Sequence, residues 1–286
     1  MSAPADSLLL VAAWPRVATA CAAAREAGTR LRFHEGLRRR IPEAAAESRV
    51  RGAWSSAALD GARVPVEVVR NLVTGRSAWP PGDATWDRVR GAVQVTAEAE
   101  RVGPLLAAGS TLAPAQALAR LHLAAAEPLG PASALGRPRG SAAGSEAPHG
   151  PTEFAMLPAP PSDPGPRLAM LGEVLAAPDV PALLVAALVH AEVALVRPFV
   201  GGNALVARAA ERAVLTARGL DATGVAVPEF GHAELGPTAY AGALAAFATG
   251  SRDGLTVWIE HCGAAFERAV TEGERIADAV RAGRLG

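Results

Sequence analysis

The chain of 286 residues predicts an all-α fold in which helices pack around one central buried helix. Apolar residues recur at helical spacing along most of the chain, and no ladder of strands with alternating apolar and polar residues is visible. Segment 183–196 (LLVAALVHAEVALV) adds a second observation, because only His190 and Glu192 interrupt its apolar run. A helix that is hydrophobic on nearly every face is buried, so we expect this segment to be the core helix of the bundle.

Start and stop signals set the bounds of the other helices. Pro114 fits the first turn of a helix, where its missing N–H would have no partner anyway, and Gly219 fits the position just after a helix end. The turn at Pro80–Asp83 precedes another helix and offers Asp83 or Thr85 as its N-cap. The predicted helices cover Ser7–Glu26, Pro65–Thr74, Trp86–Val102, Pro114–Ala126, Leu168–Ala176, Val180–Val196, Ala204–Arg218, Thr238–Thr249 and Leu255–Ala282.

Residues 128–167 break this helical pattern. The stretch holds ten prolines and six glycines, and it predicts an irregular loop or weak flap whose only strand-like piece is Thr152–Leu157. We divide the chain into an N-terminal helical region (1–90), a core (91–250) and a C-terminal helix (251–286).

Composition narrows the classes of partner. Half of the residues are apolar and the formal net charge is zero, so nothing favours a nucleic acid or an anionic membrane as the ligand. The run Arg38–Arg40 is typical of a solvated helix end. Two isolated cysteines, Cys21 and Cys262, do not make a disulfide framework and favour the cytoplasm. No run approaches the length of a membrane-spanning helix.

The segment 197–208 (RPFVGGNALVAR) carries the clearest chemistry. Gly201, Gly202 and Asn203 form a tight turn of residues that accept left-handed backbone angles, and this turn opens a helix. The first amides of such a helix have no partner within it, and the positive end of the dipole lies behind them, so the turn suits a phosphate-like anion. Arg208 and Arg212 follow one turn apart. On composition alone, a plain helix start explains the same residues.

The segment resembles the signature of the Fic family, HxFx(D/E)GNGRxxR, preceded by a buried apolar helix. A second segment resembles the inhibitory helix that many Fic proteins carry, (S/T)xxxE(G/N), at about residues 51–62. The resemblance covers roughly Arg51 to Trp258 and implies a Fic/Fido-like bundle with AMP-transferase ancestry. The matching residues are Phe199, Gly202, Asn203 and Arg208 in the first motif, and Ser56, Asp60 and Gly61 in the second.

The departures from the Fic signature bear on activity. The resemblance implies a histidine general base at position 197, but Arg197 stays protonated and cannot take a proton. It implies a carboxylate for Mg²⁺ at position 201, but Gly201 offers no side chain, which makes Mg²⁺ doubtful. Position 205 should hold a phosphate-binding arginine and holds Leu205, preceded by Ala204 in place of glycine. Transfer of AMP from ATP by the usual route (AMPylation) is therefore not expected.

The remaining polar residues have plainer interpretations. We expect Asp60 to pair with Arg208, as the inhibitory glutamate pairs with its arginine in the family. Arg197 is either a new phosphate ligand or reaches a nearby carboxylate. His190 fits a hydrogen-bonded core histidine. The other histidines (His34, His122, His149, His232 and His261) show no metal-ligand spacing, and we predict no metal site.

Three functions remain open from the sequence. The first is a catalytically impaired pseudoenzyme that acts as a nucleotide- or phosphate-binding module or as a regulatory module, with ATP, another nucleotide or a phosphate compound bound at Gly201, Gly202, Asn203 and Arg208. The second is an active nucleotidyl- or phosphoryl-type transferase whose base comes from elsewhere, such as Glu192, His190 or His232. The third is a structural helical domain that recruits a protein partner through the 128–167 loop.

Overall fold

The computed structural model describes residues 3–107, 114–140, 154 and 156–284, and within these ranges the chain forms α-helices and short 3₁₀ turns but no strand. The all-α prediction is confirmed for this part of the chain. The elements are α1 (Ala3–Ala12), α2 (Pro15–Arg32), η1 (Glu35–Leu37), α3 (Ile41–Leu59), α4 (Val66–Val73), α5 (Ala84–Leu106), α6 (Pro114–Ala126), η2 (Ala132–Ala134), α7 (Gly165–Ala176), α8 (Ala182–Val196), α9 (Asn203–Ala217), α10 (Pro228–Leu235), α11 (Pro237–Ala248) and α12 (Arg252–Arg281).

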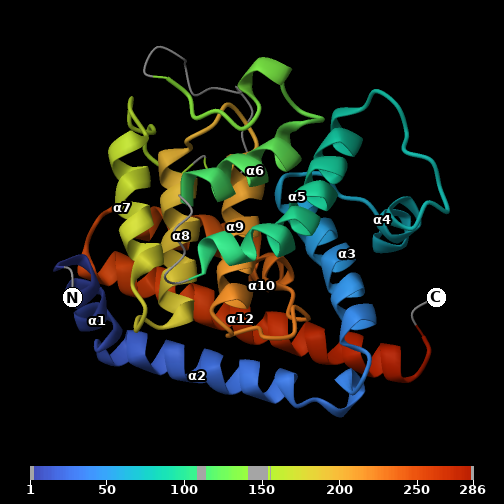
Figure 1. The fold of residues 1–286 in the computed structure, drawn as a ribbon, viewed down its shortest axis with the longest axis horizontal. Coiled ribbons are helices and arrows are strands. Elements are labelled where there is room, and N and C mark those ends of the chain that lie inside the picture. The colour runs from blue at the N-terminus through green and yellow to red at the C-terminus, as the bar shows by residue number, and fades with distance from the viewer. Residues whose placement is uncertain (1–2, 108–113, 141–153, 155, 285–286) are drawn as a thin grey trace.

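Two neighbouring helices, α8 and α9, occupy the centre of the bundle (Figure 1). Helices α5 and α6 pack together against α9, and α7 lies beside α8. The longest helix, α12, crosses one end of the bundle with α2 along its outer side, and it also packs against α10 and α11 (Figure 1). Helix α3 contacts α5, α10 and α12, which brings its C-terminal end toward α9.

Helices α8 and α9 are both buried, although only α8 is almost entirely apolar. Helix α8 is the apolar segment predicted from the sequence, and residues 183–191 are all buried. Helix α9 is buried without interruption from Asn203 to Leu215, although this stretch contains Arg208, Glu211 and Arg212. Buried charges are expensive unless they are paired, so the charged residues of α9 must find partners inside the fold.

The structure corrects the predicted helix Ser7–Glu26, which is two helices. Trp14 has extended backbone angles (φ −63°, ψ 133°), because Pro15 disfavours the helical region for the residue before it. The sequence reading also left out the first half of α3 and the whole of α10. Helix α10 is short, beginning at Pro228 and ending before Gly236, whose φ is +99°.

The loop between α6 and α7 is irregular where it is described, apart from η2 and the 3₁₀ conformation of Phe154. Within the strand-like run Thr152–Leu157, Thr152, Glu153 and Ala155 lie outside the described residues. The division at residues 90 and 91 falls inside α5, and 251–286 contains α12. These divisions stay predictions.

Among the described residues, no single helix has the length and apolarity to cross a membrane. Helices α1 and α2 have that length and apolarity only when taken together, across an 85° bend.

Candidate functional site

The segment between α8 and α9 forms the tight turn that the sequence predicts. Arg197 follows the last residue of α8 with left-handed angles (φ 44°, ψ 64°). Gly201 and Gly202 have φ of +77° and +67°, and Gly202 is the N-cap of α9. We call Gly201, Gly202, Asn203 and the first amides of α9 the anion nest. A Cβ atom at Gly201 would meet nothing within 4 Å, so this side of the anion nest is not blocked by described atoms.

Asn203 closes the turn with its side chain. Its Oδ1 accepts from the backbone N–H of Phe199 (3.0 Å), and its Nδ2 donates to the carbonyl of the same residue (2.9 Å). The ring of Phe199 stacks on the ring of His122 from α6, with 4.2 Å between centroids. Together these contacts fix the shape of the anion nest.

His122 supports the anion nest in its neutral form. Burial lowers the pKa of His122 to about 4, against smaller raising contributions from the backbone of Val200 and Gly201. Its Nδ1 accepts from the N–H of Gly136 (3.0 Å), so in the neutral ring Nε2 carries the proton.

The two apolar departures from the Fic signature are core residues. Ala204 and Leu205 are both fully buried. The side chain of Leu205 points to α5, where its Cδ1 lies 3.4 Å from the position a Cβ atom would take at Gly91. The position where the family signature has an arginine therefore belongs to the packing between α5 and α9.

Arg197, at the position of the family's general base, is held by the preceding loop. Its guanidinium donates to the carbonyl of Pro158 and lies over the ring of Phe154, 5.5 Å from the centroid. A guanidinium stays protonated and cannot accept a proton from a hydroxyl.

Arg139, which sequence reasoning missed, fastens the same loop to the end of α8. Its guanidinium donates to the carbonyls of Val196 (3.0 Å) and Arg197 (2.8 Å). It also donates to the carbonyls of Pro161 (2.5 Å) and Ser162 (3.2 Å). A cation at the C-terminal end of a helix is stabilised by the helix dipole and satisfies carbonyls that have no partner in the helix. An arginine among loop prolines gives no sequence signal of this role.

Arg208 is 1% exposed and contacts the end of α3. Its Nε donates to Ser56 Oγ (2.8 Å), and its Nη2 donates to Ser56 O (3.1 Å) and Asp60 Oδ1 (2.5 Å). Gly61 follows with φ of +87° and ends the helix. The residues matched to the two family motifs are therefore brought together, with Ser56 and Asp60 against Arg208.

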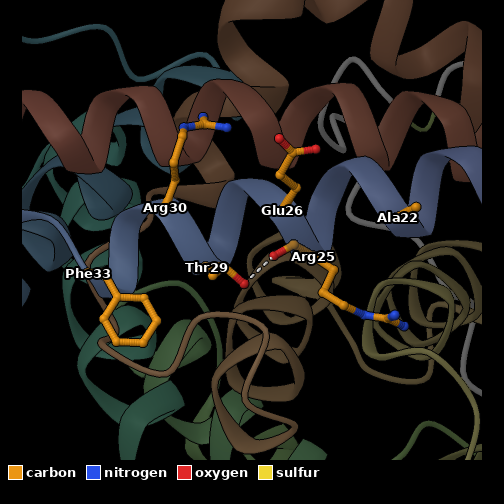
Figure 2. A pocket seen from close by; sticks show the side chains of 6 residues that line it. All are labelled: Ala22, Arg25, Glu26, Thr29, Arg30 and Phe33. Carbon is orange, nitrogen blue, oxygen red and sulfur yellow. Dashed lines mark hydrogen bonds between the residues drawn. The ribbon is translucent and has the colours of Figure 1, made fainter.

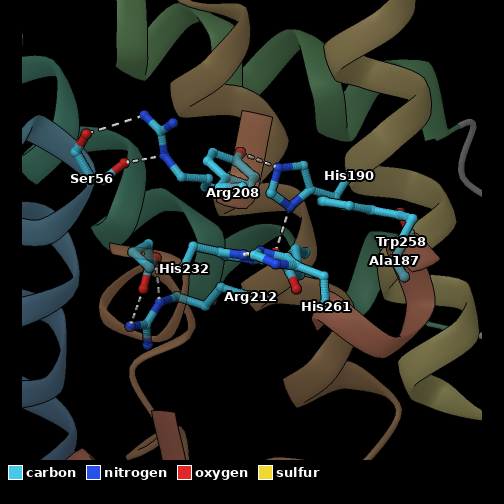
Figure 3. A network of polar contacts seen from close by, with 11 residues as sticks. Ser56, Ala187, His190, Arg208, Arg212, His232, Trp258 and His261 are labelled. Carbon is cyan, nitrogen blue, oxygen red and sulfur yellow. Dashed lines mark hydrogen bonds and ion pairs between the residues drawn. The ribbon is translucent and has the colours of Figure 1, made fainter. Parts of the chain in front are cut away.

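A second set of buried polar residues, which includes His190 and His232, lies near Arg208 (Figure 3). The carboxylate of Glu211 accepts from His190 Nδ1 (2.5 Å) and His232 Nε2 (2.8 Å) through one oxygen. We call these three residues the His–Glu cluster. Burial alone would raise the pKa of Glu211, but His232 and His190 outweigh it and hold that pKa well below its usual range. Burial lowers the pKa of His190.

Both imidazoles of the His–Glu cluster have a further partner. His190 Nε2 is 2.6 Å from Tyr240 Oη, and His232 Nδ1 is 3.1 Å from His261 Nε2. Trp258 donates from Nε1 to the carbonyl of Ala187 (2.8 Å) and its ring is parallel to that of His232. These contacts join α8, α9, α10, α11 and α12. The sequence grouped none of these residues, because their partners are 21 to 71 positions apart.

Arg212 forms a separate buried pair. Its guanidinium donates twice to Glu229, at 2.8 Å for each bond, and once to Ser48 Oγ (3.2 Å). A Cβ atom at Gly52 would lie 2.6 Å from Arg212 Nη2. Glycine at this position in α3 therefore makes room for the pair.

Two surface grooves that are lined by described residues lie away from the anion nest. One of about 550 Å³ runs along the outer face of α2 (Figure 2) and is a stripe of one helix, lined by Ala22, Arg25, Glu26, Thr29, Arg30 and Phe33. Another, of about 400 Å³, lies between Trp14, Arg167, Phe247 and Arg252. Neither includes a residue of the two family motifs.

Solved structures show which fold this is, whereas no protein-family profile and no curated protein matches the chain. A Fic family protein from Desulfovibrio desulfuricans superimposes with a TM-score of 0.65 at 18% identity, over 91% of this chain and 74% of that one. Fic-1 from C. elegans gives a TM-score of 0.63 at 15% identity, over 92% and 72%. The chain therefore has the Fic/Fido fold, as its motifs predicted.

Proposed function

We propose that this chain is a catalytically silent Fic-fold protein that binds ATP, another nucleotide or a phosphate compound at the anion nest and acts as a regulatory module. The observation that carries the proposal is the geometry of the anion nest itself. Gly201 and Gly202 have left-handed angles at the start of a buried fifteen-residue helix, and Asn203 holds the turn in shape. Amides at such a helix start suit a phosphate group.

The residues around the anion nest fit binding better than transfer. Arg197 cannot act as a general base, and it is engaged by Pro158 and Phe154. Gly201 offers no carboxylate to Mg²⁺, so the residues present do not fit the family's metal. Removal of a general base and of a preorganised phosphate donor costs about 10²–10⁴ and about 10²–10³ in rate. Of the other candidate bases, Glu192 is paired with Arg167 (2.6 Å).

Asp60 regulates access to Arg208 in this proposal. The Asp60 carboxylate accepts a hydrogen bond from the guanidinium of Arg208, which would otherwise be available to a phosphate group. The two free, buried cysteines fit a cytoplasmic location. A structural domain that recruits a protein partner is the second candidate, and it is favoured by Arg139 and Arg197, which tie the loop across the motif.

Two experiments test the proposal. Incubation with labelled ATP and Mg²⁺ or Mn²⁺ should label neither the chain nor proteins of a lysate, and robust labelling would refute catalytic silence.

Calorimetric titration with ATP, ADP and inorganic phosphate should give binding heat. Asp60→Gly should tighten ATP binding about 10-fold, since one charge-assisted hydrogen bond becomes available. Asp179→Gly, which removes an exposed loop aspartate, is the charge-matched control. No heat with any of the three ligands, for either variant, would favour the structural domain.

A further inference from the structure

The His–Glu cluster directs three metal-binding side chains at one point. Glu211 Oε2, His190 Nδ1 and His232 Nε2 lie within 4.8 Å of one another. The three residues belong to α9, α8 and α10, so the tertiary fold assembles them. Their side chains are 3%, 0% and 0% exposed, which is unusual for a carboxylate and two imidazoles.

We propose that the His–Glu cluster binds one divalent transition-metal ion, with Zn²⁺ as the ion best suited to it. Two imidazoles and one carboxylate form a ligand set that proteins use for Zn²⁺ and for other ions of this class. Bonds of about 2.0–2.2 Å to the ion place neighbouring donors roughly 3.3 Å apart in a tetrahedral site. Glu211 Oε2 lies 2.5 and 2.8 Å from the two ring nitrogens, and the ring nitrogens lie within 4.8 Å of each other. Binding of the ion therefore requires Glu211 to withdraw from each ring nitrogen by less than about 1 Å.

The residues around the cluster fix the orientation of both rings. Metal-binding histidines are usually held by a hydrogen bond at the other ring nitrogen. His190 Nε2 has Tyr240 Oη at 2.6 Å, and His232 Nδ1 has His261 Nε2 at 3.1 Å. When the ion occupies the inner nitrogens, the outer ones carry the protons and donate to these two partners.

Charge and access are compatible with an ion. Glu211 supplies one negative charge, and the nearby guanidinium of Arg208 is paired with Asp60. Three protein ligands leave one position for water or another small molecule. His261 is only half-buried and stacks on His232, with 5.3 Å between centroids. Tyr240 and Trp258 are buried, so His261 is the partly exposed one of these three aromatic neighbours of the cluster.

The decisive measurement uses the full chain without an affinity tag. The protein is stripped with a chelator and titrated with Zn²⁺ against a chromophoric competitor, and with Co²⁺ and Fe²⁺ in separate arms. We expect one ion per chain, a rise in Tm on binding, and the visible absorption of four- or five-coordinate Co²⁺. A folded wild-type protein that takes up none of the three ions at micromolar concentration would overturn the proposal, whatever the variants do. No nucleotide is present, so this result is independent of the proposed function.

Variants locate the ion. His232→Ala and Glu211→Gln should each weaken Zn²⁺ binding at least about 100-fold, and Tyr240→Phe about 10-fold. His34→Ala is the control, because His34 lies near the exposed carboxylate of Asp278 (3.9 Å) and is the place where a surface ion would bind. Loss of the ion in His34→Ala, with retention in His232→Ala, would contradict the site. If a cluster variant fails to fold, the stoichiometry and Co²⁺ spectrum of the wild-type protein decide alone.

Discussion

The two halves of α9 differ in the residues that they bury. The first half is mainly apolar, whereas the second half contains charged residues that pair with other helices. The first half corresponds to the catalytic end of the Fic signature, yet Ala204 and Leu205 there are apolar and fully buried. The second half lies beyond the signature, and it buries Glu211 and Arg212 with built-in partners on α8, α10 and α3. Arg208 stands between the halves and contacts Ser56 and Asp60.

The departures from the Fic signature at the start of α9 are therefore not accompanied by a less polar interior farther along the helix. At the start of α9, Ala204 and Leu205 belong to the core, while the two glycines and the side chain of Asn203 hold the turn of the anion nest. Farther along, Glu211 contacts His190 and His232, and the contacts of these two histidines and of Trp258 tie five helices together. The first half is therefore expected to tolerate apolar exchange, and the second half to depend on each partner.

The largest effect is expected in the second half, at Arg212. Replacing it with leucine leaves the carboxylate of Glu229 buried without its bidentate partner, which should lower the free energy of unfolding by about 3–5 kcal/mol. The double variant Arg212→Leu with Glu229→Leu should recover most of this loss, because no uncompensated charge remains. Urea unfolding measures both. Equal stability of the single and double variants would mean that the pair is not coupled.

In the first half, restoring the family arginine should destabilise the protein. Leu205→Arg buries a charge against Gly91 in α5, and we expect a loss of about 3 kcal/mol or more. Leu205→Met keeps the volume and should cost less than about 1.5 kcal/mol. The comparison of the two by thermal unfolding separates charge from size. A stable Leu205→Arg protein would show that position 205 has room for a charged side chain and a partner for it.

Lowering the pH should destabilise the fold through His122, which supports the anion nest. His122 is neutral in the fold down to its pKa of about 4, whereas the unfolded chain gains the proton near 6.5. The unfolded state therefore binds more protons between these values, and stability falls as the pH drops from 6.5 to 4, by at most about 3 kcal/mol. His122→Phe keeps the stack on Phe199 and should show a shallower pH dependence in urea unfolding. Parallel curves would exclude His122 as a contributor.

The smallest effect is expected at the turn itself. Asn203→Ala removes two hydrogen bonds to the backbone of Phe199, which should cost about 2 kcal/mol. Asn203→Asp keeps the acceptor and loses the donor, so about half of that loss is expected at neutral pH. Chemical denaturation distinguishes the two variants. If neither changes stability, the shape of the turn is set by the two glycines alone.

The sequence could predict whatever depends on local pattern. The apolar run identified α8, the Gly-Gly-Asn turn identified the start of α9, and the matched motifs predicted the Fic/Fido fold. The buried charges of α9 could not be predicted, because helical periodicity shows which face is covered and not what covers it. The partners of Glu211 lie on two other helices, 21 residues away in each direction. Arg139 was missed because its partners are backbone carbonyls, which leave no trace in side-chain patterns.

The four carbonyls that Arg139 binds also constrain when this region can form. They belong to residues 22 to 58 positions later in the chain. At a synthesis rate of about 5–20 residues per second, Arg139 is added to the chain roughly 3 to 12 seconds before its last partner, Arg197. The contacts that fasten this loop to the end of α8 can therefore form only once α8 is complete.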